Sequence, residues 1–283
     1  MPRTLDQLLH ATRTRLQAAG IDNSGFEARL LLGAALDLSA PQLIAHGADP
    51  VSDAQQAAVD ALVARREAGE PVAHILGRRG FWTLELGVSP ACLIPRPETE
   101  LLVEQALAAI DASGREQPRV LDLGTGSGAI ILALKTERPQ IQAVASDRSL
   151  HALYHARANA RDHRLEVLWL AGEWLAPLNP EYRFDVIVSN PPYIAPDDPH
   201  LTRGDLRFEP ATALVAADRG LADLQQIIDD ARAHLRPGGM LLLEHGWDQA
   251  AAVRTRLAAA GYQAITSHRD TAGHERITAA RRR

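Results

Sequence analysis

The run Val120-Leu121-Asp122-Leu123-Gly124-Thr125-Gly126-Ser127-Gly128-Ala129 lies near the middle of a chain of 283 residues. Its first part is apolar and typical of a short buried strand, and helical spacing follows over Ile130–Glu137. The glycines between them permit unusual backbone angles and the close approach of a ligand. Together with Ala129 they satisfy the loose G-x-G-x-x-G/A pattern of dinucleotide sites. We therefore predict a strand, a nucleotide-binding turn and a helix.

An acidic residue follows where such a site needs one. Asp147 ends the next strand-like run, about 20 residues beyond the glycines, where a carboxylate can bind ribose hydroxyls. NAD(H) and S-adenosylmethionine both carry an adenosine and both lie over a first strand, turn and helix. At this stage the pattern favours neither cofactor.

Strand and helix patterns alternate through the rest of the chain. The strand-like runs are Arg119–Leu123, Gln142–Ser146, Leu165–Leu170, Phe184–Ser189, Gly239–Glu244 and Glu275–Ala280. Helical stretches lie between them, at Ile130–Glu137, Leu150–Arg161, Leu221–Leu235 and Asp248–Ala260. The alternation predicts an α/β fold in which a mostly parallel sheet has helices on both faces.

The first hundred residues show a different pattern of apolar residues. We expect a small helical-bundle domain over 1–76, a β-hairpin connector over 77–97 and the α/β domain over 98–283. The front segment is rich in Ala and Leu at helical spacing, and Ser52–Gln55 resembles a capping box before a helix. Alternation in Phe81–Leu86, followed by Gly87–Ser89, predicts the hairpin.

A second turn with chemical character is Asn190-Pro191-Pro192-Tyr193, directly after the run Phe184–Ser189. Such a strand end is the usual place for a ligand in an open parallel sheet. The prolines lack N–H groups and stiffen the loop, which leaves backbone carbonyls free to accept hydrogen bonds. The Asn oxygen accepts as well, and the Tyr offers a flat ring. The turn suits a planar group that carries an NH2, such as an amide or an exocyclic amine.

Composition narrows the classes of function. The net charge is -5, and the segment 1–76 carries six basic and nine acidic residues, which argues against stable nucleic-acid binding. The single cysteine, Cys92, fits a reducing compartment and excludes a cysteine metal cluster. Apolar runs long enough for a membrane helix and a secretory leader are both missing from the sequence, so we expect a cytoplasmic protein without membrane contact.

The two turns together discriminate between cofactors. A hydride-transfer enzyme needs an acid/base partner for a carbinol and gains nothing from Asn-Pro-Pro-Tyr, whereas methyl transfer to a weakly nucleophilic NH2 needs such acceptors. Asp122–Gly128 with Asn190–Tyr193 resembles the signature of class I S-adenosylmethionine-dependent amino-methyltransferases. Three alternatives remain open: a nucleic-acid adenine N6-methyltransferase, a nucleotide sensor without catalysis and, least favoured, an NAD-linked oxidoreductase.

The resemblance narrows to one family. Phe81-Trp82, Val88–Pro90 and Leu93–Glu100 are similar to the segment that precedes the catalytic domain in the HemK/PrmC family. Further similar segments are DLGTGSG (Asp122–Gly128), NPPYI (Asn190–Ile194), Arg207–Pro210 with Ala213-Leu214, and Leu243–Gly246. The resemblance implies a Rossmann-like, seven-stranded methyltransferase domain behind a helical domain that recognises the substrate protein. The implied activity is methylation of the side-chain amide nitrogen (N5) of the glutamine in the Gly-Gly-Gln motif of class 1 peptide chain release factors. S-adenosyl-L-methionine would be the cofactor, S-adenosyl-L-homocysteine the product, and the release factor the protein partner.

The resemblance also implies roles for individual residues. Gly124, Thr125, Gly126, Ser127 and Gly128 would form the turn under the cofactor, Asp147 would hold the ribose, and Trp174 would lie against the adenine. Asn190 would contact cofactor and substrate, and Pro191, Pro192 and Tyr193 would line the substrate side. In the chemistry we expect, the Asn190 side-chain oxygen and the Pro191 carbonyl accept the two amide N–H bonds, and Tyr193 packs against the amide face. A sulfonium methyl group is already electrophilic, so no metal is expected.

Four other residues have open roles at this stage. Glu98 and Glu100 suit the start of a helix, where acids favour the positive end of its dipole. Glu209 either braces the Asn-Pro-Pro loop or lies on the surface, and a structural hydrogen bond is the favoured role of His245. The histidines His74, His151, His155 and His163 show no metal-ligand pattern.

Overall fold

The structure, a computed structural model, describes residues 3–202 and 204–283 of the chain. It divides into two compact units, each with its own core. One unit comprises Met1–Gly77 with Thr202–Phe208, and the other comprises Arg78–Leu201 with Glu209–Arg283. The chain therefore leaves the second unit once and contributes a short loop to the first, a grouping of which the sequence pattern gives no sign.

The first unit is helical, as its apolar spacing predicts. Its helices are α1 (Leu5–Ala18), α2 (Ser24–Leu36), α3 (Ala40–Ala45), α4 (Asp53–Glu67) and α5 (Val72–Leu76). The predicted capping box is confirmed: the Ser52 side chain accepts from the Gln55 backbone N–H, and the Gln55 side chain accepts from that of Ser52. The core is built from leucines and valines, among them Leu8, Leu31 and Val59.

A buried ion pair ties the loop Thr202–Phe208 to these helices. Arg66 in α4 donates to Glu27 in α2 at 2.6 Å, and both side chains are largely buried. The same guanidinium reaches Asp205 at 3.2 Å. A buried guanidinium needs such partners, because an unpaired charge in a protein interior is costly.

The second unit begins with the hairpin of β1 (Arg78–Phe81) and β2 (Leu84–Gly87). The hairpin predicted from Phe81–Leu86 and Gly87–Ser89 is present, and Trp82 and Thr83 form its turn. Trp82 has a φ of 55°, and its backbone N–H donates to Glu100 at 2.9 Å. Tryptophan rarely adopts the left-handed backbone conformation. The local sequence therefore does not indicate a turn at this position.

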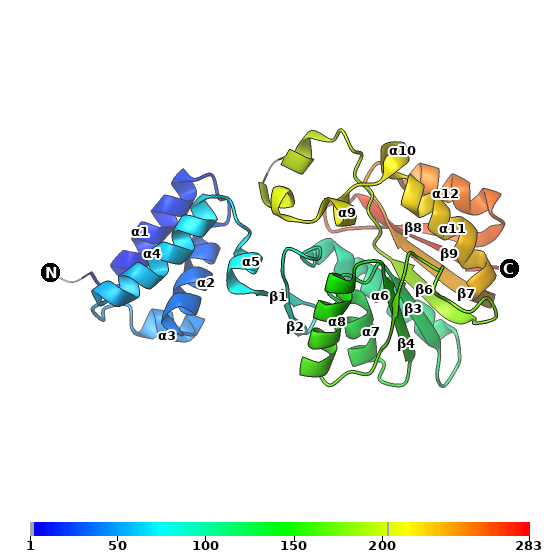
Figure 1. The fold of residues 1–283 in the computed structure, drawn as a ribbon, viewed down its shortest axis with the longest axis horizontal. Helices are drawn as coiled ribbons and strands as arrows, with labels where there is room; N and C mark the ends of the chain where they lie inside the picture. Colours follow the sequence, from blue (N-terminus) through cyan, green and yellow to red (C-terminus); the bar gives the residue numbers. More distant parts are fainter. Residues whose placement is uncertain (1–2, 203) are drawn as a thin grey trace. The chain divides into compact units, whose positions relative to one another are not determined.

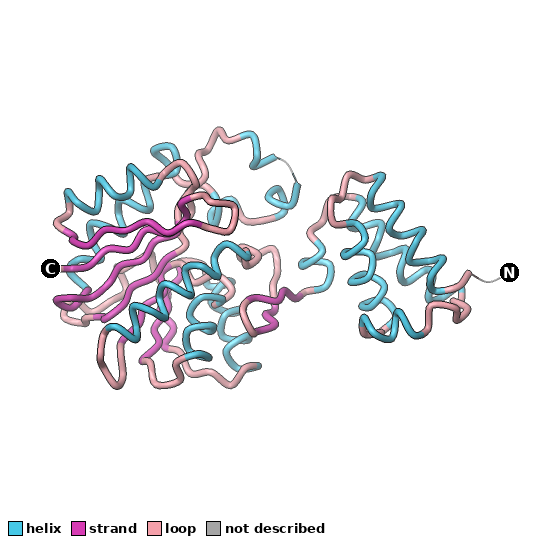
Figure 2. The backbone as a smooth tube through the Cα atoms, turned by 180° about the vertical axis from the view of Figure 1, so that it is seen from behind, coloured by secondary structure: helices cyan, strands magenta, loops and turns pink. Residues whose placement is uncertain are grey.

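The main sheet has seven strands in the order β5-β4-β3-β6-β7-β9-β8. They are β3 (Arg119–Leu123), β4 (Gln142–Asp147), β5 (Leu168–Ala171), β6 (Phe184–Ser189), β7 (Leu235–Glu244), β8 (Tyr262–Arg269) and β9 (Glu275–Arg282). The first five are parallel, and β9 runs antiparallel to both of its neighbours. Seen from behind, the strands lie side by side as one twisted sheet (Figure 2). The predicted α/β class with a mostly parallel sheet is confirmed.

Helices cover both faces of this sheet. Helices α6 (Glu100–Ala112) and α7 (Ala129–Glu137) build one core, and α11 (Ala222–His234) and α12 (Ala250–Ala259) build the other (Figure 1). Helix α8 (Leu150–Asp162) packs beside β4 and β5. The short helical pieces are η1 (Pro97–Thr99), η2 (Pro199–Thr202), η3 (Gly204–Phe208), α9 (Ala211–Leu214) and α10 (Ala217–Gly220).

Strand β8 was missed by the sequence analysis. It is the edge strand of the sheet, and its side chains are mostly exposed or half-buried. An edge strand with little buried surface lacks the apolar alternation by which strands are recognised. In the described part of the chain, no helix is both long and apolar enough to cross a membrane.

Candidate active site

The parallel register brings the two predicted turns to the same edge of the sheet. Leu123 pairs with Ser146 on one side and with Ser189 on the other, and Ser189 pairs with Leu243. The next residue along each strand is therefore Gly124, Asp147, Asn190 or Glu244. The carboxyl ends of parallel strands are where open α/β sheets bind ligands.

The glycine-rich turn follows β3 and has left-handed backbone at three positions. Gly124, Gly126 and Gly128 have φ values of 68°, 57° and 85°. The backbone N–H groups of Gly124 and Thr125 donate to the Ser146 carbonyl at 2.9 and 3.0 Å, which anchors the turn to β4. A Cβ on Gly124 would come within 3.0 Å of the Trp174 ring. The site therefore requires glycine for its backbone angle and for the close approach of an aromatic ring.

Asp147 is placed to hold a ligand hydroxyl. Its carboxylate accepts from the Gly126 N–H at 2.9 Å and from the Ser149 N–H at 2.8 Å. An ionised carboxylate has about four acceptor positions, so two remain after these bonds. Burial raises the pKa of Asp147 despite the two hydrogen bonds. Donation from a bound diol would favour the charged form.

A second acid lies under the same turn. Asp122 is fully buried and accepts from the Thr125 hydroxyl at 2.6 Å. Burial raises its pKa to about 7, against the effect of this hydrogen bond. Asp122 lies in the predicted motif without a predicted role, and the structure shows that it holds Thr125 in the turn.

The Asn-Pro-Pro-Tyr turn follows β6 and is held from three sides. The Asn190 side-chain nitrogen donates to the Thr99 hydroxyl at 3.2 Å, and the Tyr193 hydroxyl donates to Glu244 at 3.3 Å. The Gln249 side-chain nitrogen donates to the Tyr193 carbonyl at 2.9 Å. In the described residues, no group donates to the Pro191 carbonyl. The Asn190 side-chain oxygen and this carbonyl are therefore free acceptors.

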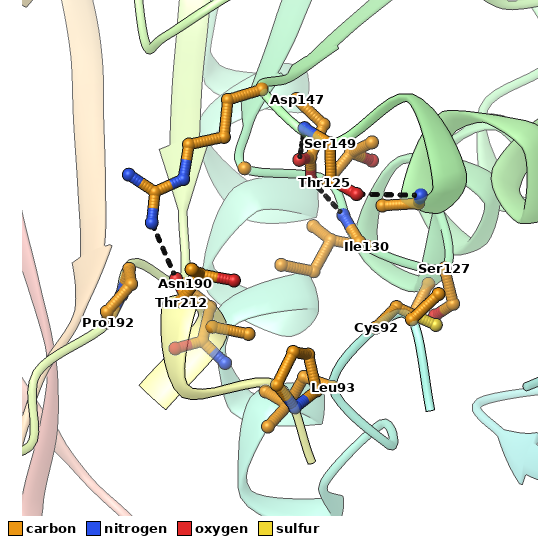
Figure 3. A pocket seen from close by; sticks show the side chains of 18 of the residues that line it. Cys92, Leu93, Thr125, Ser127, Ile130, Asp147, Ser149, Asn190, Pro192 and Thr212 are labelled. Atoms are coloured by element: carbon orange, nitrogen blue, oxygen red, sulfur yellow. Dashed lines mark hydrogen bonds between the residues drawn. The ribbon is translucent and has the colours of Figure 1, made fainter. Parts of the chain in front are cut away.

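One cavity joins the two turns. Of the predicted site residues, its wall contains Gly124, Thr125, Gly126, Ser127, Asp147, Trp174, Asn190 and Pro192. In Figure 3, Asp147 and Ser149 lie at one side of the cavity, and Asn190 and Pro192 lie at another. Gly128, Pro191 and Tyr193 do not line it. Gly128 is instead the N-cap of α7, where a Cβ would press on Leu132 at 3.1 Å.

The cavity has further walls that the sequence analysis did not assign. They come from Ala91–Leu93 and Pro95, from Arg96 and Thr99, from Arg148 and Ser149, and from the α9 segment with Pro210, Thr212 and Ala213. Arg96 pairs with the buried Glu209 at 2.6 Å, and Arg148 donates to the Thr212 carbonyl at 3.1 Å. The segment around α9 is thus held by Arg148, which follows β4, and by Arg96, which precedes η1. Glu209 holds this wall, so its surface role is excluded.

The remaining open residues lie outside the cavity wall. Glu98 lies in η1, and Glu100 begins α6 and accepts from the hairpin turn. His245 is fully buried and bonds the Gly246 carbonyl and the Thr278 hydroxyl, as favoured. Within residues 3–202 and 204–283, no cluster of His, Cys, Asp and Glu could hold a metal ion.

The donor set fits S-adenosylmethionine. Asp147 retains acceptor positions for the ribose, and the Trp174 ring next to Gly124 offers a flat apolar face for an adenine. The positive φ values of Gly124 and Gly126 keep side-chain bulk out of this end of the cavity. An apolar wall with few polar groups is typical of a nucleoside site.

Comparison with known proteins agrees with this geometry. The family model "PrmC N-terminal domain" matches residues 7–77, and "Methyltransferase small domain" matches residues 97–212. Curated release factor glutamine methyltransferases are similar over most of the chain. The protein of Xylella fastidiosa (strain Temecula1) is 53% identical, with 90% of this chain and 92% of the relative covered. That of Escherichia coli K12 is 51% identical over 84% and 85%, and that of Vibrio cholerae is 46% identical over 98% and 96%.

Solved structures support the fold alone. A methyltransferase from Pyrococcus furiosus matches with a TM-score of 0.53 and 18% identity, covering 77% of this chain and 96% of that one. The Thermus thermophilus 16S rRNA N2 G1207 methyltransferase, solved with AdoMet and guanosine, matches with a TM-score of 0.53 and 22% identity, covering 73% and 50%. The predicted class I methyltransferase fold is thus confirmed, and the curated relatives define the family. The chain belongs to the HemK/PrmC family of release factor glutamine methyltransferases.

Proposed function

We propose that this protein transfers the methyl group of S-adenosylmethionine to the side-chain amide nitrogen of the glutamine in the Gly-Gly-Gln motif of class 1 release factors. The observation that carries the proposal is the shared cavity. Its wall includes the glycine-rich turn and Asp147 at one end and Asn190 with Pro192 at the other. The curated relatives, named for this activity, support the same conclusion.

The cofactor end works by backbone shape. The turn Gly124–Gly128 leaves room for the nucleoside, Asp147 accepts from the ribose hydroxyls, and Trp174 packs against the adenine. When bound, the cofactor supplies a sulfonium methyl group, which is strongly electrophilic. The chain's own contribution is to hold that group at a fixed distance from the Asn190 turn.

The substrate end works by hydrogen-bond acceptors. A carboxamide nitrogen is a poor nucleophile, because its lone pair is delocalised into the carbonyl. The Asn190 side-chain oxygen and the Pro191 carbonyl accept hydrogen bonds from its two N–H groups and oppose the positive charge that develops on the nitrogen during attack. Once methylated, the nitrogen loses one of these two protons to solvent, which leaves a neutral N-methyl amide. Because Asn190 donates its own N–H to Thr99, its oxygen is left for the substrate. Fixed orientation of this kind contributes several kcal/mol to a rate.

Tyr193 has a role on the same side. Its hydroxyl is held by Glu244, and burial together with that carboxylate raises its pKa, so the hydroxyl stays protonated as a donor. Its half-buried ring packs against the face of the substrate amide. Pro191 and Pro192 keep this turn stiff, because each ring fixes the backbone angle φ.

The helical unit, residues 1–76, recognises the release factor away from its glutamine. Two large apolar side chains of this unit are exposed, Phe26 at 56% and Ile44 at 79%. Replacing either with Asp is expected to raise the KM for a whole release factor at least fivefold, since charge disfavours burial in an interface. Tyr154→Asp, at an aromatic of the other unit with an exposure between those two, is the control. An unchanged KM in both helical variants would assign that unit another role.

The function itself is tested by labelling. The protein is incubated with radiolabelled S-adenosylmethionine, a purified class 1 release factor and duplex DNA, and the labelled polymer is identified. We expect label in the release factor, and none in a release factor whose Gly-Gly-Gln glutamine is replaced by alanine. Label in the DNA would instead support the adenine N6-methyltransferase, an alternative that the curated relatives do not support.

A further inference from the structure

A buried acid lies behind the Asn190 turn, outside the cavity. Glu244 ends β7 and is 1% exposed. One of its oxygens, Oε1, accepts from the Tyr193 hydroxyl at 3.3 Å. The other, Oε2, has no well-aligned donor among the described residues. The Thr99 hydroxyl nevertheless lies close enough to this carboxylate to lower its pKa.

Thr99 connects this acid to the proposed substrate site. It is 4% exposed, it forms part of the cavity wall, and its hydroxyl oxygen accepts from the Asn190 side-chain nitrogen at 3.2 Å. A hydroxyl carries a single proton. While its oxygen accepts from Asn190, that proton points away and can be donated to Glu244. The side chains then form one directed chain of hydrogen bonds, from Asn190 through Thr99 to Glu244.

We propose that Glu244 is a positioning residue for methyl transfer, which acts through Thr99 to keep the Asn190 amide oxygen turned toward the substrate. This inference rests on the proposed function. The effect of reversing these hydrogen bonds shows why Glu244 must be ionised. A protonated Glu244 donates to Thr99, and Thr99 then donates to Asn190. The Asn190 amide must flip to accept this bond, and it then presents an NH2 to the substrate NH2, where an acceptor is required.

The surroundings of Glu244 place this switch near neutral pH. Burial raises its pKa to about 7, although Thr99, Tyr193 and the charge of Arg276 on β9 lower it. Glu98 in η1 adds a repulsive charge. The neighbouring His245 has a pKa lowered by burial, so it carries no charge at neutral pH. Since the pKa of the acid is raised, the protonated form accumulates as the pH falls through about 7, and turnover is expected to fall with it.

The test measures kcat and KM for a purified release factor between pH 6 and 9, with the full-length protein. The unchanged chain should lose kcat below about pH 7 along a single-protonation curve. Glu244→Gln, which keeps the shape of the protonated acid, should lower kcat at pH 8 at least ~tenfold and remove the pH dependence. Both KM and the affinity for S-adenosylhomocysteine should stay within ~threefold, because neither ligand touches Glu244.

Two Thr99 variants and a matched acid complete the design. Thr99→Val should reproduce the loss of kcat, and Thr99→Ser should restore most of it, because serine keeps the hydroxyl. Asp185→Asn is the control: Asp185 is also a buried strand carboxylate, but it pairs with Arg115 and Arg236 at the opposite end of β6. Its variant should keep the pH profile of the unchanged chain.

Each possible result either supports or contradicts the proposed role of Glu244. A Glu244→Gln protein with full kcat and an unaltered pH profile would overturn the proposal, and so would a fully active Thr99→Val. If Glu244→Gln does not fold, as judged by thermal melting, the Thr99→Val and Thr99→Ser pair carries the test alone. If the unchanged chain labels no release factor, the proposed function fails, and this is seen before any variant is made.

Discussion

The two turns at the edge of the sheet differ in residue type: one is rich in glycine, and the other contains two prolines. The turn after β3 has three glycines with positive φ, and backbone N–H groups anchor it to its neighbour. The turn after β6 has two buried prolines, which have no N–H to donate, and it presents carbonyl and amide oxygens. In the proposed function, the first turn gives room for a large nucleoside, and the second gives rigid acceptors for a small planar amide. We therefore expect changes in the first turn to alter affinity for the cofactor and changes in the second to alter the rate of transfer.

The largest effect is expected from Asn190→Ala, which removes an acceptor from the rigid turn. Loss of one such transition-state hydrogen bond costs on the order of 10²–10³ in rate, so kcat should fall about 1,000-fold. The dissociation constant for S-adenosylmethionine should stay within roughly tenfold, since the other turn is intact. Single-turnover kinetics and calorimetry measure the two quantities. Asn179→Ala, at an exposed turn, is the control and should change neither.

Gly124→Ala should produce the reverse pattern at the glycine-rich turn. The new Cβ meets the Trp174 ring at 3.0 Å in a backbone with a φ of 68°, so the ring must move. We expect the dissociation constant for S-adenosylmethionine to rise about 30-fold while kcat at saturating cofactor changes only a few-fold. Gly114→Ala has a similar φ of 64° and meets nothing within 4 Å, and it separates backbone strain from contact. Equal affinities in both variants would remove the contact from the account.

A smaller loss of affinity is expected from Asp147→Asn. The amide keeps one acceptor but puts an NH2 where the second carboxylate oxygen accepts hydrogen bonds, so cofactor binding should weaken about tenfold. The carboxylate has a pKa raised by burial, so protonation should weaken binding in the same way as the pH falls. Calorimetry at several pH values checks both statements. An affinity that is independent of pH and unchanged in the variant would contradict the role of Asp147.

The smallest effect is expected from Pro192→Ala, which softens the rigid turn without removing an acceptor. A proline at a compatible position restricts the chain by about 0.4–1 kcal/mol. We therefore expect a two- to fivefold lower kcat, with cofactor affinity unchanged. Pro180→Ala, in a turn away from the cavity, should leave kcat as it is. A loss larger than that of Asn190→Ala would mean that the rigidity of the turn outweighs its acceptors.

Both turns were predictable from the sequence, because each is a compact pattern at the end of an apolar run. Gly124–Gly128, Asp147 and Asn190 belong to segments that a local pattern identifies, whereas Trp174 was expected only from the family resemblance. Thr99 and Glu244 have no such local pattern, since one ends a 3-10 turn and the other ends a strand more than a hundred residues away. Only the register that pairs Ser189 with Leu243 brings Glu244 to the Asn190 turn. Local sequence predicts where a strand ends and which residues form the following turn. The residues that hold a turn from behind depend on which strands become neighbours in the sheet.

The contacts that hold the cavity wall were likewise not predictable from local sequence. Arg148 follows the predicted Asp147, and Thr212 lies between the two segments noted for their resemblance, Arg207–Pro210 and Ala213-Leu214, but their contact joins two distant loops. Likewise, the loop Thr202–Phe208 groups with the helical unit through Asp205 and the buried Arg66, which no periodicity in either segment indicates. Long-range ion pairs of this kind leave no local trace in a sequence.

The most direct test of the account is a crystal structure with S-adenosylhomocysteine and a release factor, or a peptide that contains Gly-Gly-Gln. We predict that the glutamine side-chain nitrogen lies within about 3.2 Å of both the Asn190 side-chain oxygen and the Pro191 carbonyl, with its free face toward the cofactor sulfur. A complex in which the Asn190 oxygen is turned away from the glutamine, or in which the glutamine nitrogen is bound elsewhere, would contradict the central claim.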